Sequence, residues 1–230
     1  MLLLIYIMVV IILLFTANIL FLKIFTVIAS KIVLNSDSKP VVNKKKSIVG
    51  KLKSFLYYYY QLNVLVAGNV PSFTLRRLFY KHICGLQIGK GSKIRMNVEI
   101  LYPWNIKIGD NCLIGKYCIL DGRYGIVIED NVNMSDYSAI WTMQHDVNDT
   151  DFGCSGKCGK VTIKKRSWLC FRSVILPKVT IGEGVVLATA AVAVKNCDDF
   201  GIYTGIPAKR IKDRNPGIKY NLDISQMHFG

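Results

Sequence analysis

At 230 residues the chain is long enough for one sizeable core with an appendage and too short for two full domains. Thirty basic residues against fifteen acidic ones give a formal net charge of +15, which admits nucleic acid, anionic lipid or an anionic small molecule as partner. The odd count of seven cysteines argues against a secreted disulfide scaffold and favours a reducing compartment.

Residues 1–34 form the first predicted element, a membrane anchor. Residues 1–22 carry no charge, and about 20 such residues span a bilayer as a helix. A cleaved signal peptide is one alternative, but it would need a basic region before its apolar run, and this chain begins MLLL. A helix buried in a soluble core is the second alternative, but an apolar run of 22 residues is longer than such helices usually have. We therefore expect a retained transmembrane helix.

Residues 35–53 read as a polar, lysine-rich linker. From Lys23 to Lys53 there are eight lysines against one acid, Asp37, and this bias predicts that the following domain faces the cytoplasm. The run NKKKS (Asn43–Ser47) predicts contact with acidic lipid headgroups. The chain has no helix-turn-helix, zinc-finger or RNA-binding signature, so nucleic acid is not the expected partner.

Residues 54–85 read as two short amphipathic helices, broken at Gly68–Pro71, with Ser72 as the cap of the second. Their aromatic and basic side chains suit the interface of a membrane. Packing across the end of a core explains the same composition equally well, and both interpretations can hold together.

From residue 86 a repeat of six residues replaces the helical pattern. Apolar residues, Ile, Leu or Met at fourteen of fifteen positions, recur at every sixth position in five triplets, which restart after 20 residues twice and after 18 once. Neither a helix, with a period of 3.6, nor a simple strand, with a period of two, gives this spacing. The pattern predicts a parallel β-helix of about five coils over residues 86–214. The repeated positions are Ile88, Ile94, Ile100, Ile108, Ile114, Leu120, Ile128, Met134, Ile140, Ile163, Leu169, Ile175, Ile181, Leu187 and Ala193.

A second repeated position, four residues after the first, holds only small side chains such as Ser92, Cys112, Cys118 and Cys197. We expect these to point inward, where a cysteine acts as a small hydrophobe. The residue directly after the large apolar one is glycine at Gly89, Gly109, Gly115 and Gly182. Glycine is expected there for a tight bend that can require positive φ.

Three places interrupt the repeat. About two extra residues are expected at corners near Pro103 and Trp104 and again at Gly122–Gly125, and a loop of residues 146–160 should leave the prism directly after His145. His145 itself lies five residues after the inward Ile140, at a corner and facing out. An exposed corner histidine and a general base are equally good interpretations of the spacing.

The segment Pro71–Arg214 resembles the hexapeptide-repeat acyltransferases. Within them it is similar to the branch that O-acetylates sugars of bacterial capsules, exopolysaccharides and lipopolysaccharides and includes the maltose and galactoside acetyltransferases. The stretches that carry the resemblance are PSFTLRRLFYKHICGLQIGKGSKI, PWNIKIGDN, LDGRYGIVI, SAIWTMQHDVNDTDF, SWLCFRSVILPKVTIGEG and GIPAKRI.

The resemblance implies a left-handed parallel β-helix, a homotrimer with active sites between neighbouring prisms, and acetyl-CoA as co-substrate. The histidine at the position of His145 is the family's base, which deprotonates a sugar hydroxyl for direct attack on the thioester of acetyl-CoA. No cysteine nucleophile is needed for this reaction, and inward thiols are inert.

The same resemblance implies a donor site. Trp168 matches the tryptophan of the family's WIG segment, which lines the acyl-donor cleft, and an aromatic at a subunit contact is the alternative. Lys195, Lys209 and Lys212 match basic or polar positions near the CoA phosphates, where cations suit a polyanionic donor. Thr189 stands among residues that are small in the family, where the pantetheine arm approaches the backbone.

Asp121 and Arg123 lie at a corner one coil before the strand that leads to His145. If coils stack at a spacing of 20, Asp121 lies beside Trp141. We expect Asp121, Arg123 and Trp141 to contact the acceptor, with simple corner capping as the alternative for Asp121. Asp146 should point away from its neighbour in an extended strand, and we expect it to reach substrate across a trimer contact.

The leading hypothesis is a membrane-anchored O-acetyltransferase that modifies a bacterial surface glycan or its lipid-linked precursor. Glycines usual in the family are missing at Cys170 and Lys178 and within residues 188–190, and Val194 replaces a frequent threonine, so a catalytically inactive scaffold at the membrane is the alternative. A metal-dependent carbonic anhydrase on this fold needs three histidines together. His82 and His228 lie outside the coils, so no metal is expected. A tail, residues 215–230, follows the prism.

Overall fold

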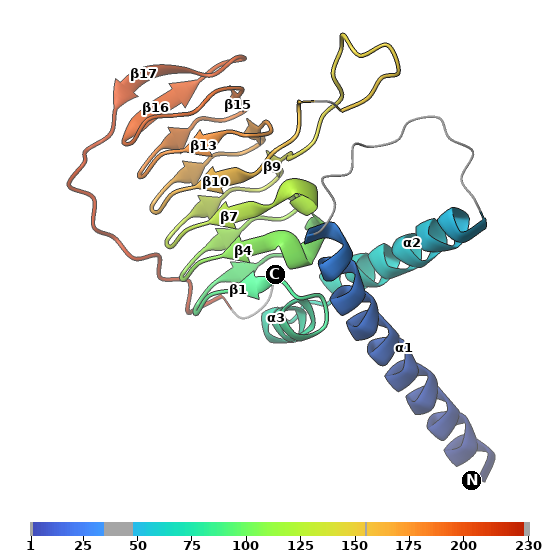
Figure 1. Ribbon diagram of the computed structural model, residues 1–230. Helices are drawn as coiled ribbons and strands as arrows, with labels where there is room; N and C mark the ends of the chain where they lie inside the picture. The colour runs from blue at the N-terminus through green and yellow to red at the C-terminus, as the bar shows by residue number, and fades with distance from the viewer. Residues whose placement is uncertain (1, 35–47, 155, 228–230) are drawn as a thin grey trace.

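The chain folds into a three-sided β prism with three helices at one end, as the computed structural model shows for residues 2–34, 48–154 and 156–227 (Figure 1). Residues 35–47, most of the predicted linker, lie outside the described residues. The three helices are α1 (Leu2–Leu34), α2 (Ile48–Gly68) and α3 (Phe73–His82).

Each side of the prism is one sheet. Face 1 contains β1 (Gln87–Ile88), β4 (Ile106–Ile108), β7 (Ile126–Ile128), β10 (Val161–Ile163) and β13 (Thr180–Ile181). Face 2 contains β2 (Lys93–Ile94), β5 (Leu113–Ile114), β8 (Asn133–Met134), β11 (Trp168–Leu169), β14 (Val186–Leu187), β16 (Gly201–Thr204) and β17 (Lys209–Asp213). Face 3 contains β3 (Glu99–Leu101), β6 (Ile119–Asp121), β9 (Ala139–Ile140), β12 (Val174–Ile175) and β15 (Val192–Ala193).

The predicted parallel β-helix is confirmed. Equivalent residues of successive coils pair in register, as in the column Ile88, Ile108 and Ile128, which continues to Ile163 and Ile181. All fifteen residues at the repeated apolar position, fourteen large ones and Ala193, are buried, and none is more than 7% exposed. Five coils are complete. The parallel strand β16 then adds a sixth layer to face 2, and the antiparallel β17 ends the stack.

The corner glycines are needed for a reason other than the expected one. Gly89, Gly109, Gly115 and Gly182 do not have positive φ. A Cβ at Gly89 would lie 2.4 Å from the carbonyl oxygen of Gly109, because the next coil approaches the backbone closely. The left-handed residue follows two positions later, as in Gly91, Asn111, Tyr117 and Gly184. The prediction of a tight bend holds, whereas the assignment of positive φ to these glycines was wrong.

The extra corner residues form two short 3-10 helices, η1 (Pro103–Asn105) and η2 (Gly122–Tyr124). The larger insertion between β9 and β10 leaves the prism as a loop, at the place that the break in the repeat predicted (Figure 1).

The helices cover the first coil. Helix α2 begins at Ile48, earlier than the predicted start at residue 54, because Lys51 and Lys53 are good helix formers and extend it. Ser72 caps α3 as predicted, since its side chain accepts a hydrogen bond from the amide of Leu75. The guanidinium of the buried Arg76 donates to the carbonyl of Ile94 and fixes α3 to β2.

The far end of α1 belongs to the core as well. Leu22 and Thr26 are buried, the hydroxyl of Thr26 donates to that of Tyr60 at 3.2 Å, and the ring of Phe25 stacks on Tyr60 at 5.0 Å. Trp104 of η1 completes this aromatic cluster, with its ring 5.6 Å from that of Tyr60. The N-terminal half of α1 extends away from the domain (Figure 1).

Candidate active site

His145 follows β9 at the corner between faces 3 and 1, and its side chain is exposed. Its Nδ1 atom lies 2.5 Å from the carbonyl oxygen of Phe152, and its ring stacks on that of Phe152 with centroids 4.1 Å apart and planes 10° apart. A carbonyl oxygen can only accept, so Nδ1 carries a proton, and in the neutral imidazole the lone pair is then on Nε2. The ring is thus held in the tautomer that a general base requires.

The loop after β9 brings Phe152 back to His145. Its two arms run antiparallel, with a bridge between Met143 and Cys158 and a hydrogen bond of 2.8 Å from the amide of Asp146 to the carbonyl of Gly153. The carboxylate of Asp146 accepts from the amide of Asn148 at 3.1 Å and so caps the turn that follows. Sequence reasoning missed Phe152, since a loop residue has no place in the six-residue repeat.

The contact of Cys154 with His145 was missed for the same reason. Cys154 is buried beside the base, with Sγ 3.6 Å from Nδ1 of His145. Desolvation, and then the neighbouring Cys158 thiol, raises the pKa of Cys154. The thiol therefore stays protonated at neutral pH, packs against the imidazole and is a poor nucleophile.

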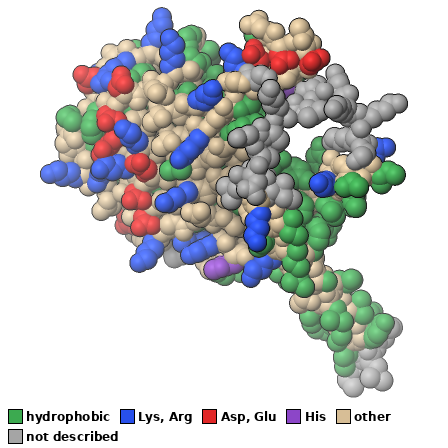
Figure 2. Space-filling view, in the orientation of Figure 1, with side chains coloured by type: hydrophobic (Ala, Val, Ile, Leu, Met, Phe, Trp, Pro, Cys, Tyr) green, Lys and Arg blue, Asp and Glu red, His purple; other side chains and the backbone are tan. Residues whose placement is uncertain are grey.

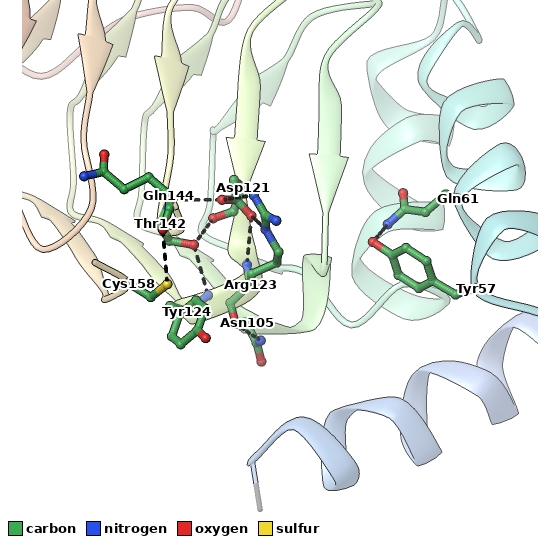
Figure 3. A network of polar contacts seen from close by, with 9 residues as sticks. All are labelled: Tyr57, Gln61, Asn105, Asp121, Arg123, Tyr124, Thr142, Gln144 and Cys158. Carbon is green, nitrogen blue, oxygen red and sulfur yellow. Dashed lines mark hydrogen bonds and ion pairs between the residues drawn. The ribbon is translucent and has the colours of Figure 1, made fainter. Parts of the chain in front are cut away.

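Asp121 is fully buried and its carboxylate is occupied by the chain itself. Arg123 donates to it from Nε at 2.8 Å and from Nη2 at 3.0 Å, and the amide of Thr142 donates at 3.0 Å. The Thr142 hydroxyl donates to the carbonyl of Asp121 and accepts from the amide of Tyr124 (Figure 3). This network ties β6 and η2 to the backbone three residues before His145, so the geometry favours the corner-capping interpretation of Asp121.

Arg123 keeps its charge in this network. Burial lowers the pKa of Arg123, and the hydrogen bonds that it donates to the Asp121 carboxylate raise it, with a net rise. Its side chain is 31% exposed, whereas that of Asp121 is not exposed at all. Trp141 follows β9 and is half-buried, with its amide bonded to the carbonyl of Ile175. Substrate contacts of Arg123 and Trp141 stay predictions.

The predicted donor residues lie elsewhere on the prism. Trp168 is on β11 of face 2, 42% exposed, and its Nε1 donates to the hydroxyl of Ser135 at 3.1 Å. Lys209 and Lys212 are exposed on β17 at the end of the same face. Thr189 is exposed at the corner between faces 2 and 3, and Lys195 is exposed at the corner between faces 3 and 1.

One chain therefore does not bring the predicted base and the predicted donor tryptophan together. In a three-sided prism the corner between faces 3 and 1, which carries His145, is opposite face 2, which carries Trp168. Lys195 shares the corner of His145, two coils further along. A site that used both groups would need face 2 of a second copy.

Among the described residues no group of three or more histidine, cysteine, aspartate or glutamate side chains could hold a metal ion. The chemistry available at this corner is acid–base chemistry by an exposed imidazole.

Comparison with known proteins gives consistent matches. Residues 105–133 match the family described as hexapeptide repeat of succinyl-transferase. The putative colanic acid biosynthesis acetyltransferase WcaF of Escherichia coli is 30% identical over 138 residues, which cover 60% of this chain and 75% of WcaF.

Two solved structures share the fold. The maltose O-acetyltransferase of Clostridium difficile superposes with a TM-score of 0.62 at 23% identity, covering 69% of this chain and 87% of that one. AntD, an N-acyltransferase from Bacillus cereus in complex with dTDP and 3-hydroxybutyryl-CoA, superposes with a TM-score of 0.54 at 27% identity, covering 64% of this chain and 92% of that one.

Proposed function

Because this chain belongs to the hexapeptide-repeat acyltransferases and is an acyl-CoA-dependent acetyltransferase, we propose that it transfers an acetyl group from acetyl-CoA to a hydroxyl of a bacterial surface glycan or its lipid-linked precursor. The observation that carries the proposal is the contact between Nδ1 of His145 and the carbonyl of Phe152, which leaves Nε2 ready to accept a proton. The names of WcaF and of the maltose O-acetyltransferase support a sugar acceptor.

In the proposed reaction Nε2 of His145 takes the proton of the sugar hydroxyl while the oxygen attacks the thioester carbonyl. The tetrahedral oxyanion collapses and breaks the C–S bond, and the imidazolium returns its proton to the departing thiolate, so the products are the acetyl ester and free CoA thiol. A sugar hydroxyl ionises far above neutral pH, and a positioned base is worth roughly 10²- to 10⁴-fold in rate. The Phe152 carbonyl would stabilise the imidazolium that forms.

We propose a homotrimer as the active assembly. Its support is the separation of His145 from Trp168, which a second prism would close by placing its face 2 against the first prism's corner. Trp168, Thr189, Lys195, Lys209 and Lys212 would then bind the donor. Holding both substrates in one cleft supplies much of the remaining rate enhancement.

The proposed location is the cytoplasmic side of a membrane, with α1 as a retained anchor. The helix contains a span of 28 residues, Leu4–Lys31, that is apolar enough to cross a bilayer. Burial of Leu22 and Thr26, with the hydroxyl of Thr26 bonded to that of Tyr60, supports retention, because cleavage after these residues would remove them and expose the aromatic cluster. The lysine bias from Lys23 to Lys53 supports the orientation.

The test is to incubate the purified chain in lipid nanodiscs with isotope-labelled acetyl-CoA and candidate glycans. We expect release of free CoA thiol, and mass spectrometry of a product that has gained one labelled acetyl ester. Absence of any labelled glycan across polysaccharide, oligosaccharide and lipid-linked acceptors would contradict the proposal.

The second candidate is an inactive scaffold. It is favoured by the absence of glycines that are usual in the family, at Cys170, at Lys178 and within residues 188–190. Calorimetric titration with CoA separates the two candidates, since a decayed donor site gives no heat of binding.

A further inference from the structure

Helix α2 has two apolar faces, one packed in the core and one largely exposed. Tyr60, Val64 and Gly68 are buried against the first coil and α1. The opposite side, which we name the outward face of α2, repeats at spacings of three and four residues and so forms one stripe along the helix. All its members are exposed, from 39% for Tyr59 to 85% for Ile48, and they are Ile48, Leu52, Phe55, Tyr59, Leu62 and Val66.

The outward face continues the apolar surface of α1. Between Leu4 and Leu20 the apolar side chains of α1 point outward on every side, so this part of the helix is not packed in a soluble core. The two helices are joined where they cross, since Asn18 donates to Asn63 at 2.8 Å and accepts from the hydroxyl of Tyr59 at 2.9 Å. Figure 2 shows hydrophobic side chains gathered on α1 and α2, whereas charged side chains are scattered over the prism.

The charge around α2 suits an anionic lipid surface. From Ser38 to Val98 the sequence contains twelve lysines and arginines and no aspartate or glutamate; of the twelve, Arg76 is buried and Arg95 pairs with Asp136. Lys51 lies on α2 beside the outward face and Lys81 lies on the neighbouring α3, and both side chains are exposed. Basic side chains beside an apolar stripe attract a helix to anionic headgroups while the stripe enters the boundary of the acyl chains.

We propose that the outward face of α2 lies in the interface of the same bilayer that α1 crosses. This inference rests on the proposed anchoring by α1 and adds a second membrane contact to it. In Figure 1, α1 leaves the first-coil end of the prism and α2 lies across it. With α1 in the bilayer and α2 on its surface, the first coil faces the membrane and the remaining coils stack away from it.

The proposal limits the acceptor. His145 follows β9, two strand spacings from β3 of the first coil, and α2 packs beneath that coil. Strand spacings of about 4.8 Å and a helix diameter of about 10–12 Å place the base roughly 20 Å from the lipid-facing side of α2. The acceptor hydroxyl then belongs to a sugar held well above the headgroups, on a glycan chain rather than on the first sugar attached to a lipid.

The experiment measures the depth of single nitroxide labels in the full chain, reconstituted in nanodiscs of phosphatidylcholine and phosphatidylglycerol. Labels go on Leu52→Cys and Leu62→Cys of the outward face, on Leu13→Cys of α1, and on Lys107→Cys of face 1. The background is Cys158→Ser, because the other six cysteines are buried. All four label sites are exposed, and thermal unfolding that matches the unlabelled parent shows that each labelled chain is folded.

We expect Leu52 and Leu62 labels to collide with lipid-soluble oxygen several-fold more often than with a water-soluble nickel chelate, as at Leu13, and the reverse at Lys107. Dominant nickel collisions at both α2 sites would place them in water and overturn the proposal. Low collision rates with both reagents would mean that protein, such as a second copy, covers the face, and would also overturn it. If the label at Leu13 is in water too, the proposed anchoring by α1 is wrong as well. The proposed acetyl transfer is tested by a separate assay and does not depend on this result.

Discussion

The imidazole of His145 lies face to face on the ring of Phe152, and its Nδ1 atom contacts the carbonyl oxygen of the same residue at 2.5 Å. One loop residue thus fixes both the plane and the tautomer of the proposed base. The arrangement depends on the loop closing against the end of β9. The network of Asp121, Arg123 and Thr142 fixes the backbone at the start of this loop, because the amide of Thr142 donates to the carboxylate of Asp121.

Removing the partner of a buried charge should destabilise the prism. In Arg123→Met the carboxylate of Asp121 stays buried without its cation, and we expect a loss of roughly 2–4 kcal/mol in the free energy of unfolding. The double variant Asp121→Asn/Arg123→Met should recover part of that loss. Thermal unfolding of both variants checks this, and equal melting temperatures for Arg123→Met and the parent would show that the pair contributes nothing.

Lys209 and Lys212 should act only on the phosphate end of the donor. We expect the variants Lys209→Gln and Lys212→Gln to raise the KM for acetyl-CoA roughly tenfold, as loss of about 1.4 kcal/mol of binding implies. The KM for acetyl-pantetheine, which lacks the nucleotide phosphates, should not change. Lys107→Gln, on face 1, is the matched control. An equal rise in the KM for acetyl-CoA and for acetyl-pantetheine would show that these lysines do not bind the phosphates.

Alkaline pH should destabilise the prism through its inward thiols. Desolvation raises the pKa of Cys112 to about 11 and that of Cys118 to about 12, from an ordinary value of 9.0. Above pH 9 the unfolded chain loses these protons, whereas the folded chain keeps that of Cys112 up to about pH 11 and that of Cys118 up to about pH 12, so the free energy of unfolding falls as pH rises through this range.

The matched variant for this prediction is Cys118→Ser, because Ser138 and Ser173 occupy the same inward position in the following coils. Its melting temperature should fall by several degrees less than that of the parent between pH 8.5 and 10.5. Parallel curves for variant and parent would count against the buried-thiol explanation.

Protein extracted from membranes should keep its first residues. The proposed anchor predicts an intact mass that includes residues 1–22, since Leu22 is part of the folded core. Intact-mass spectrometry of the purified chain measures this directly. A mature chain that starts after the apolar run would mean that the segment is a signal peptide.

The sequence predicted the prism better than the site, for a physical reason. Equivalent positions of successive coils, such as Ile114 and Met134, stack on one another, and this stacking imposes a regular spacing of apolar residues along the sequence. The positions of η1 and η2 and of the loop were predicted as interruptions of that period. Contacts inside the loop, such as those of Phe152 and Cys154 with His145, have no period and depend on how the loop folds.

Asp121 shows the same limit at a corner. Its register beside Trp141 was predictable from the spacing of 20 residues, but its burial depends on η2, which turns Arg123 back onto the carboxylate. The contacts of Thr26 and Phe25 with Tyr60 could not be predicted from hydropathy either. Helix α1 is apolar along its whole length, so its composition does not distinguish the part that packs on the domain from the part that extends away from it.

The measurement that tests the account most directly is the rate of CoA thiol release by His145→Ala in the acetyl-transfer assay, with His82→Ala as the matched control, since both histidines are exposed. The account predicts a fall of roughly 10²- to 10⁴-fold for His145→Ala with an unchanged melting temperature and assembly, and a parental rate for His82→Ala. Equal rates for His145→Ala and the parent would contradict it.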